Sequence, residues 1–153
     1  MSNRVSPSRA LPSYKTTVKV RDHCLCLHLQ RAARAVARRF DELMRPAGLT
    51  SGQFSLLMSL NRPEPPTMRA VAELLAMDRT TLTANLKPLE RRGLVRIKID
   101  QDDRRSRRLV LTAKGRAALI AALPAWQEGH AAIEPALAGR KTDRLRTDLR
   151  ALA

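Results

Sequence analysis

One predicted helix, residues 79–92, carries hydroxyl groups and cations along its outer side. Its spacing turns Leu82, Leu86 and Leu89 inward. The outward polar residues are Arg79, Thr80, Thr81, Thr83, Lys87 and Arg91. Threonine hydroxyls bond phosphates or base edges, threonine methyls contact thymine methyls, and the cations neutralise phosphate. The alternative is a helix face that is only solvated. Three threonines are poor helix formers and suit such a face badly. The pattern therefore favours a surface that recognises nucleic acid.

A second concentration of charge follows in residues 100–108, which read DQDDRRSRR. Between Arg91 and Arg108 there are eight basic and three acidic residues. Arginine suits insertion into a narrow minor groove, where the potential is most negative, and neighbouring acids can hold arginines in register by bidentate pairing. The candidate contacts are Asp103, Arg104, Arg105 and Arg107. The alternative, a flexible charged turn, remains open for any single arginine.

The composition indicates which kind of negatively charged partner the chain binds. Lys and Arg number 29 against 14 Asp and Glu, a formal charge of +15, which favours nucleic acid or an anionic surface. Aromatic residues make up only 3% of the chain, too few for the stacking platforms that bind single strands. Duplex DNA is therefore the expected partner. No apolar run approaches the roughly 18 residues of a membrane span, so no membrane partner is expected.

Motifs of enzymes and of secreted proteins are missing from the sequence. It has neither a glycine-rich phosphate loop nor a nucleophile elbow, and its clustered acids lie among arginines, where their pKa values should fall. We expect no enzyme activity, no cofactor and no metal. Two cysteines one residue apart in a helix cannot easily bridge. The first twenty residues lack the apolar stretch of a secretory signal, so a reducing cytoplasm is the expected location.

The periodicity predicts a scaffold that is mainly α with a small β-wing. Within residues 51–112 we expect helices over 51–60, 68–75 and 79–92, then strands over 95–99 and 109–111. The predicted N-caps are Thr50, with Gln53 completing a capping box, then Thr67 and Asp78; Gly93 is the expected C′ glycine, and Val71, Leu74 and Leu75 should be buried. Helix, turn, helix and basic hairpin in this order indicate a winged helix-turn-helix.

Amphipathic helices flank this unit, one over 22–45 and others from 113 to 152, the first of these capped by Thr112. Pro124 is expected to interrupt or kink the latter, and Gly139 to end it before a last helix over 141–152. Neither end can cover its apolar stripe alone, so a homodimer is predicted, which places two recognition helices about one DNA turn apart. Residues 1–20 are predicted to be a basic flexible arm and 21–153 a single domain.

The run MDRTTLTANLKPLERRGLVRIKIDQDDRRSRRLVLTAKG, with the upstream Met44–Thr50 and Gln53–Phe54, resembles the MarR family of bacterial transcription regulators. The resemblance covers about residues 22–138. It implies a homodimer, with 22–45 and 113–152 as dimerisation helices, that binds a palindromic operator. It assigns Thr80, Thr81 and Thr83 to the recognition helix, and Arg105, oriented by Asp103, to the minor groove. Pro88 departs from the polar residue usual there.

The resemblance also implies a signal that releases DNA, either a small-molecule effector or oxidation of a cysteine. The local candidates for sensing are Cys24, Cys26 and His28, within HCLCLH. Cys26 matches the reactive cysteine of members that sense organic hydroperoxides, but their nearby tyrosines are not matched, since Phe40 takes the position of the first. Cys26 as a small buried hydrophobe is the alternative. A metal on Cys24 and His28 would need two further ligands.

Together these observations predict a sequence-specific, double-stranded DNA-binding transcription regulator that acts as a repressor. The alternative is a basic protein that associates with DNA or RNA by charge alone, without sequence preference. The charge of +15 suits both, whereas the threonine-bearing helix face is needed only by the first.

Overall fold

The computed structural model describes residues 11–137 and 142–152. The predictions for residues 1–10 of the arm and for Gly139 lie outside the described residues. The chain divides into two compact units, Met1–Val36 and Ala37–Ala153. Among the described residues, no helix has the length and apolar character that crossing a membrane requires.

The first unit differs from its prediction. Helix α1 (Tyr14–His23) occupies part of the predicted flexible arm, because the Ser13 hydroxyl accepts the backbone N–H of Thr16 at 3.3 Å and caps the helix. The helix predicted over 22–45 is also divided: Cys24 is extended, with ψ 105°, and α2 (Leu25–Met44) starts after it. The Leu27 N–H points to Cys24 Sγ at 3.4 Å, as it would to an N-cap side chain.

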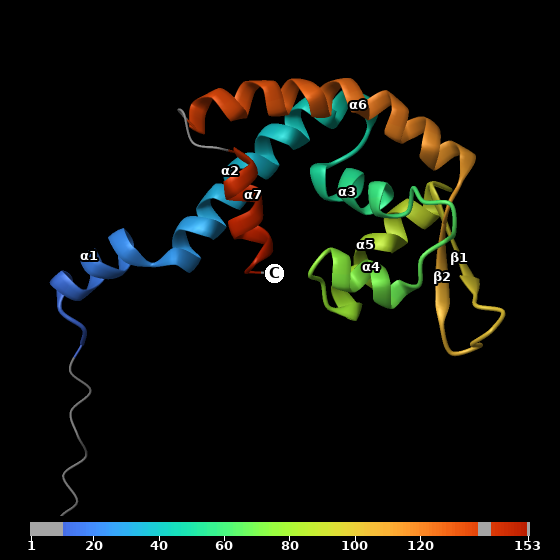
Figure 1. The fold of residues 1–153 in the computed structure, drawn as a ribbon, viewed down its shortest axis with the longest axis horizontal. Coiled ribbons are helices and arrows are strands. Elements are labelled where there is room, and N and C mark those ends of the chain that lie inside the picture. Colours follow the sequence, from blue (N-terminus) through green and yellow to red (C-terminus); the bar gives the residue numbers. More distant parts are fainter. Residues whose placement is uncertain (1–10, 138–141, 153) are drawn as a thin grey trace, which may run out of the picture. The chain divides into compact units, whose positions relative to one another are not determined.

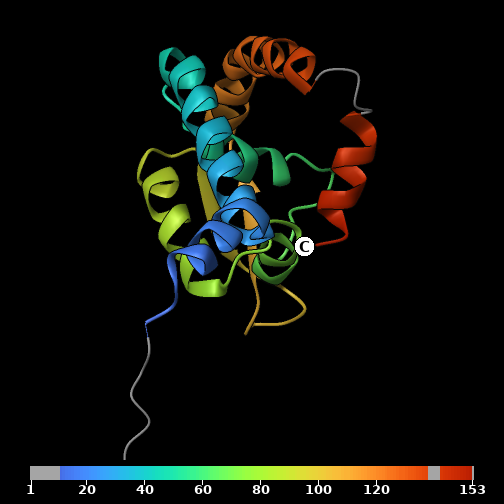
Figure 2. The same ribbon diagram turned by 90° about the vertical axis from the view of Figure 1, so that its left-hand side faces the viewer.

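The second unit confirms the mainly α architecture with a small β-wing. After α2 come η1 (Arg45–Ala47), α3 (Ser51–Ser59), α4 (Met68–Leu74), α5 (Arg79–Arg91), β1 (Val95–Ile99), β2 (Arg107–Leu111), α6 (Ala113–Ile133), η2 (Glu134–Leu137) and α7 (Thr142–Arg150) (Figure 1). The strands pair antiparallel, from Val95 opposite Leu111 to Ile99 opposite Arg107. Their connecting turn extends away from α6 in both views (Figures 1 and 2).

Side-chain caps fix the helix starts of this unit where the sequence predicted them. In each case the cap oxygen accepts the backbone N–H three residues later. The caps are Thr50, Thr67, Asp78 and Thr112, and the capping box of Thr50 with Gln53 is complete. The boundaries of the helix-turn-helix are therefore set locally, by hydroxyl and carboxylate groups.

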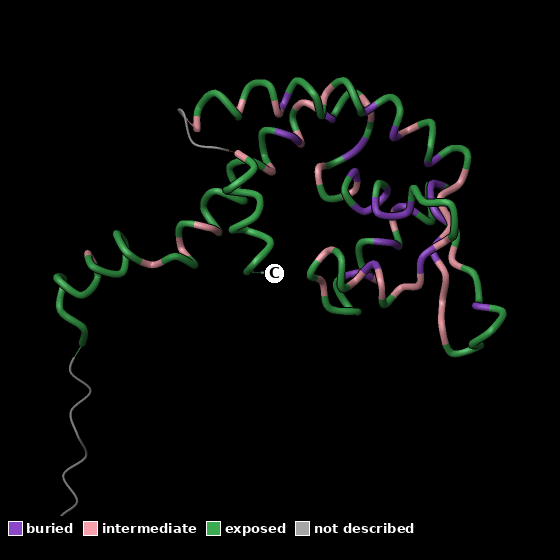
Figure 3. Tube along the Cα trace, viewed as in Figure 1, coloured by how far each residue is buried: buried purple, intermediate pink, exposed green. Residues whose placement is uncertain are grey.

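The core lies among the end of α2, helices α3, α4 and α5, the base of the hairpin and α6 (Figure 3). Leu82, Leu86 and Leu89 are buried, as predicted. The burial predicted for Leu74 is wrong, since 58% of that residue is exposed. The inward face of α4 follows residues 68, 71, 72 and 75, and residue 74 lies about 100° away from its centre by helical geometry.

Both prolines inside helices are accommodated without ending the helix. Helix α5 continues past Pro88, and α6 continues past Pro124. Of the two outcomes expected at Pro124, an interruption or a kink, the interruption therefore does not occur. Each proline deprives the carbonyl four residues earlier of its N–H donor. Those carbonyls belong to Ala84 and Ile120, two residues on the exposed sides of their helices.

A tight joint connects the wing to α6. The Thr112 hydroxyl donates to the Gly93 carbonyl at 2.7 Å, and its backbone N–H donates to the Leu94 carbonyl at 3.1 Å. A Cβ on Gly115 would lie 2.2 Å from the Leu94 carbonyl oxygen. Only glycine permits this approach, which fixes the start of α6 against the end of α5.

Candidate nucleic-acid interface

The outer face of α5 forms a shallow hollow of about 300 Å³. It is lined by Arg79, Thr80, Thr83, Ala84 and Lys87, so the structure brings together most of the residues predicted for this face. Thr81, which the prediction grouped with them, does not line the hollow. Hydroxyls and cations thus share one concave surface that protein atoms leave open.

The three threonines differ in their hydrogen bonds. Thr81 donates its hydroxyl to Asp78 Oδ2 at 2.7 Å and its backbone N–H to Oδ1 at 2.8 Å, so its side chain is part of the helix cap. These donations, the hydroxyl's first, lower the pKa of Asp78 below its ordinary value. Thr83 donates its hydroxyl to the Arg79 carbonyl at 2.7 Å. Among the described residues, the Thr80 hydroxyl has no partner.

An ion pair anchors the base of the wing. Asp100 is only 5% exposed, and its Oδ2 accepts from Arg108 Nε at 2.6 Å, while Oδ1 accepts from the Asp102 N–H at 3.0 Å. Arg108 also donates to the Pro65 carbonyl at 3.0 Å. The pKa of Asp100 is lowered, chiefly by the Asp102 N–H and then by Arg108, against desolvation that raises it.

The predicted wing contacts lie at the turn beyond this anchor. Asp103 Oδ1 accepts the backbone N–H of Arg105 at 2.9 Å, so Asp103 holds the backbone of the turn, and no bidentate pair with the Arg105 guanidinium is formed. Arg107 folds back to donate to the carbonyls of Arg104 and Ser106 at 2.9 and 3.1 Å. Within the described part of the chain, the exposed side chains of Arg104 and Arg105 have no hydrogen-bond or ionic partner.

The sequence reasoning did not single out Asp100, Arg108 or Pro65. A signal was present, because Lys98 pairs with Arg108 across the hairpin, and Asp100 follows two positions after Lys98 on the same side. That diagonal is within reach of long side chains. The loop of prolines, by contrast, gave no indication that its carbonyl would accept from the wing.

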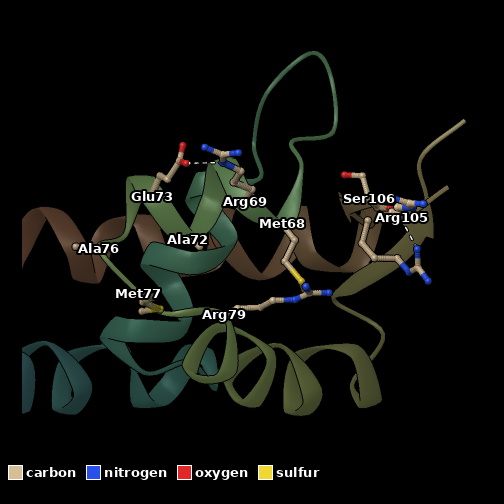
Figure 4. Close-up of a pocket in the computed structure, with 10 residues that line it drawn as sticks. Met68, Arg69, Ala72, Glu73, Ala76, Met77, Arg79, Arg105 and Ser106 are labelled. Carbon is tan, nitrogen blue, oxygen red and sulfur yellow. Dashed lines mark hydrogen bonds and ion pairs between the residues drawn. The ribbon is translucent and has the colours of Figure 1, made fainter. Parts of the chain in front are cut away.

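A larger cavity, of about 450 Å³, lies between α4 and the wing (Figure 4). It is lined by Met68, Arg69, Ala72, Glu73, Ala76, Met77, Arg79, Arg105, Ser106 and Arg107. Figure 4 shows Arg79 extending from the start of α5 toward Met68, with Arg105 and Ser106 on the side of the wing. Two candidate DNA contacts from separate elements, Arg79 and Arg105, therefore line one cavity.

The candidate sensing residues lie in the first unit, apart from these surfaces in sequence. Cys26 is exposed in the single chain and accepts from Gln30 Nε2 at 3.2 Å, so the described residues of the same chain do not bury it. Cys24 is half-buried, and His28 Nε2 donates to the Asp22 carbonyl at 3.2 Å. In residues 11–137 and 142–152 no three His, Cys, Asp or Glu residues gather where they could hold a metal ion.

Comparisons with known proteins agree with this geometry. The family model of the MarR family matches residues 47–106. The organic hydroperoxide resistance transcriptional regulator of Bacillus subtilis (strain 168) is 32% identical over 91 residues, 60% of this chain and 62% of that protein. The regulator TtmR of Methylorubrum extorquens is 36% identical over 95 residues, 62% of this chain and 49% of that protein. The chain thus spans less than two thirds of the length of these curated relatives.

Solved structures match over more of the chain. The M. tuberculosis transcriptional regulator MosR in complex with DNA is 41% identical, with a TM-score of 0.77, and the match covers 85% of this chain and 93% of that one. The transcriptional repressor CouR bound to a 23-mer DNA duplex is 32% identical, with a TM-score of 0.74, and the match covers 88% and 94%. The chain therefore belongs to the MarR family of transcriptional regulators.

Proposed function

We propose that this protein is a sequence-specific, double-stranded DNA-binding transcription regulator. In this proposal α5 lies in the major groove, and the wing places Arg105 in the adjacent minor groove. The observation that carries it is the hollow of α5, where the Thr80 hydroxyl lies with two cations, in the same unit as a wing anchored by Asp100 and Arg108. An anchored turn presents exposed arginines at less entropic cost than a flexible one.

The proposed contacts divide by role. Thr80 and Thr83 contact base edges, while Arg79 and Lys87 contact phosphates, because a hydroxyl can read a base whereas a point charge positions the protein. Arg104 and Arg105 act at the wing, supported by the Asp103 carboxylate through the backbone. Thr81 and Arg107 contribute to the shape of these surfaces, because Thr81 belongs to the cap of α5 and does not line the hollow, and Arg107 folds back onto the turn.

A homodimer on a palindromic operator is part of the proposal. Helices α6 and α7 and the turn after α7 leave large apolar side chains exposed: Ile120, Leu123, Trp126, Leu145, Leu149 and Leu152. Large apolar side chains exposed in number are typical of an interface. Two copies related by a two-fold axis would bind two half-sites with opposite orientation.

We further propose that the protein represses transcription until a signal releases it, by a small ligand or by oxidation of Cys26. CouR is described as a repressor, another CouR structure contains p-coumaroyl-CoA, and the Bacillus subtilis relative is named for organic hydroperoxide resistance. Cys26 is exposed, as a reactive thiol must be. Affinity for the operator should fall after peroxide treatment in the wild type and not in Cys26→Ser; equal responses would remove Cys26 from the proposal.

Selection of bound sequences from random duplexes tests the central proposal. The expected result is one short motif with two-fold symmetry, bound with an affinity that falls steeply as salt rises. Wild type and Thr80→Val should be compared, because the variant keeps the fold and charge and alters only a candidate base contact. No enriched motif would favour the second candidate, binding by charge alone, which the net charge of +15 supports.

A further inference from the structure

The hollow on the outer face of α5 presents methyl groups between two cations. Three of the side chains that line it end in methyl groups: Thr80, Thr83 and Ala84. The other two, Arg79 and Lys87, contact phosphates in the proposed function. The lining contains no Asn, Gln, Asp or Glu, the side chains that read adenine and cytosine by hydrogen bonds. The hollow is therefore suited to apolar contact with base edges.

Hydrogen bonds within the protein reduce the polar contacts that this face can make. Thr83 donates its hydroxyl proton to the Arg79 carbonyl at 2.7 Å, so that proton is not available to a base. Asn85 carries the only side-chain amide of α5, but it does not line the hollow, and its Nδ2 donates to Met77 Sδ at 3.7 Å. The Thr80 hydroxyl is then the one neutral side-chain donor of the hollow.

Pro88 extends the apolar character of this face along the helix. It lies one turn after Ala84, on the same side by helical geometry. Its ring carries neither a donor nor an acceptor, and it is half-buried, so part of the ring is accessible. A polar side chain at this position would add a hydrogen-bonding reader of the bases. Proline leaves only van der Waals contact for this turn of α5.

We propose that this face of α5 recognises thymine through its C5 methyl group, with Thr83 and Ala84 as specificity-determining residues. Among the four bases, thymine alone presents a methyl group in the major groove. The methyl groups of Thr83 and Ala84 pack against it, and the Thr80 hydroxyl adds one hydrogen bond. The inference rests on the proposed function, because α5 must lie in the major groove for this face to meet base edges.

Recognition of a methyl group has a consequence for modified DNA. In 5-methylcytosine the methyl group is attached to the same ring carbon as in thymine and lies in the same groove. A C·G pair in place of a contacted T·A pair should weaken binding, and methylation of that cytosine should restore part of the lost affinity. Binding should therefore respond to cytosine methylation at the contacted positions.

The first test changes only the DNA. Each thymine of the duplex obtained by selection is replaced in turn by deoxyuridine, which removes the methyl group and keeps the O4 acceptor and the pairing with adenine. At the contacted thymines the wild type should lose about two- to fourfold in affinity, the worth of one buried methyl group. Thymines outside the selected motif are the controls. A motif without thymine, or one that tolerates every uracil, would overturn the proposal.

The second test changes only one side chain. Thr83→Ser removes the methyl group and keeps the hydroxyl that donates to the Arg79 carbonyl, whereas Thr83→Val keeps the methyl group and removes the hydroxyl. Thr83→Ser should bind the selected duplex about two- to fourfold more weakly and lose its response to uracil at the contacted position. Thr83→Val should retain both properties.

Thr81→Ser is the matched control, because it removes a methyl group outside the hollow and keeps the hydroxyl that bonds Asp78. It should bind as the wild type does. A larger loss of affinity in Thr83→Val than in Thr83→Ser would show that the oxygen reads the base, and would overturn the proposal.

Failure of the proposed function gives a different result. A selection without any enriched motif would refute sequence-specific binding, and recognition of thymine with it. An enriched motif that the wild type and Thr83→Ser bind equally, with thymine or with uracil, would leave the proposed function in place. That outcome would refute the recognition of the methyl group alone.

Discussion

At the scale of single residues, the three threonines of α5 have different roles because their hydroxyls have different partners. Thr81 belongs to the cap with Asp78, whereas the Thr80 hydroxyl is unpartnered among the described residues. We expect Thr81→Val to lower the free energy of unfolding by about 1 kcal/mol with little change in DNA specificity. Thr80→Val should show the reverse. Chemical denaturation measures the effect of each variant on stability, and binding to matched and mismatched duplexes measures its effect on specificity. Equal effects of the two variants would contradict the different roles of Thr80 and Thr81.

Arg105 offers a direct test of the wing. Its side chain makes no hydrogen bond or ion pair within the described residues, so Arg105→Ala should leave the melting temperature unchanged. DNA affinity should fall at least about tenfold, and the salt dependence of that affinity should become shallower by a slope of about one, because one cation fewer displaces counterions from the DNA. Arg31→Ala removes the same charge from α2 and is the control. A wild-type affinity in Arg105→Ala would show that the wing does not enter the groove.

Asp100 makes the stability of the wing depend on pH. Its pKa is lowered in the folded state, so its stabilisation is complete above the ordinary aspartate pKa of about 3.9 and is lost as pH falls through the folded value. The wild type should therefore be more stable than Asp100→Asn at neutral pH. That difference should shrink between about pH 5 and about pH 2. A difference in melting temperature that stays constant across this range would contradict an ionised Asp100.

The sequence was sufficient to predict which residues form the candidate interface. It was not sufficient to predict which of them have free side chains and which are held by hydrogen bonds within the protein. Helical geometry placed Thr80, Thr81 and Thr83 on one side, because direction follows from position alone. The capture of Thr81 by Asp78 depends on side-chain torsions, which no spacing encodes. Likewise Asp103 is close to Arg105, as predicted, but binds its backbone N–H rather than its guanidinium.

At the scale of elements, α4 and α5 end in the same way with different residues. Each ends in a Schellman motif: Met77 N–H donates to the Ala72 carbonyl after α4, and Leu94 N–H to the Leu89 carbonyl after α5, both at 2.9 Å. The left-handed residue is Gly93 in one, with φ 71°, and Ala76 in the other, with φ 49°. The turn of the helix-turn-helix thus contains a strained alanine.

Exchanging these residues should change stability in opposite directions. Ala76→Gly removes a steric cost of about 1–2 kcal/mol and adds unfolded-state entropy worth less than that, so the free energy of unfolding should rise by about 0.5–1 kcal/mol. Gly93→Ala should lower it by about 1 kcal/mol, although nothing lies within 4 Å of the added Cβ. Urea denaturation measures both. A destabilised Ala76→Gly would show that this backbone is not strained.

Prediction of the elements succeeded where local chemistry sets their boundaries. Thr50, Thr67, Asp78 and Thr112 mark helix starts that the structure confirms, because a cap acts within three residues. The division at Cys24 was missed, since the apolar spacing on either side gives no sign of a backbone break. At Pro124 the sequence allowed an interruption or a kink, and the interruption does not occur, because a helix can lose one hydrogen bond and continue.

At the scale of the whole molecule, the proposed dimer rests on apolar side chains that α6 and α7 leave exposed. Ile120 is 63% exposed in the middle of α6, so Ile120→Glu should leave the monomer fold intact. Placing a charge in an apolar interface should weaken association by about tenfold or more. Ala84→Glu adds the same charge to an exposed position of α5 and should not alter association.

Sedimentation at several protein concentrations measures this effect, and DNA binding extends it. A dimer on a palindrome contacts phosphates in two half-sites, whereas a monomer contacts one, so the salt dependence of Ile120→Glu should have about half the wild-type slope. Ala84→Glu serves as the control for association only, because it lies on the proposed recognition face. A wild-type protein that sediments as a monomer while still selecting a two-fold symmetric site would contradict a preformed dimer, since symmetry would then arise only on the DNA.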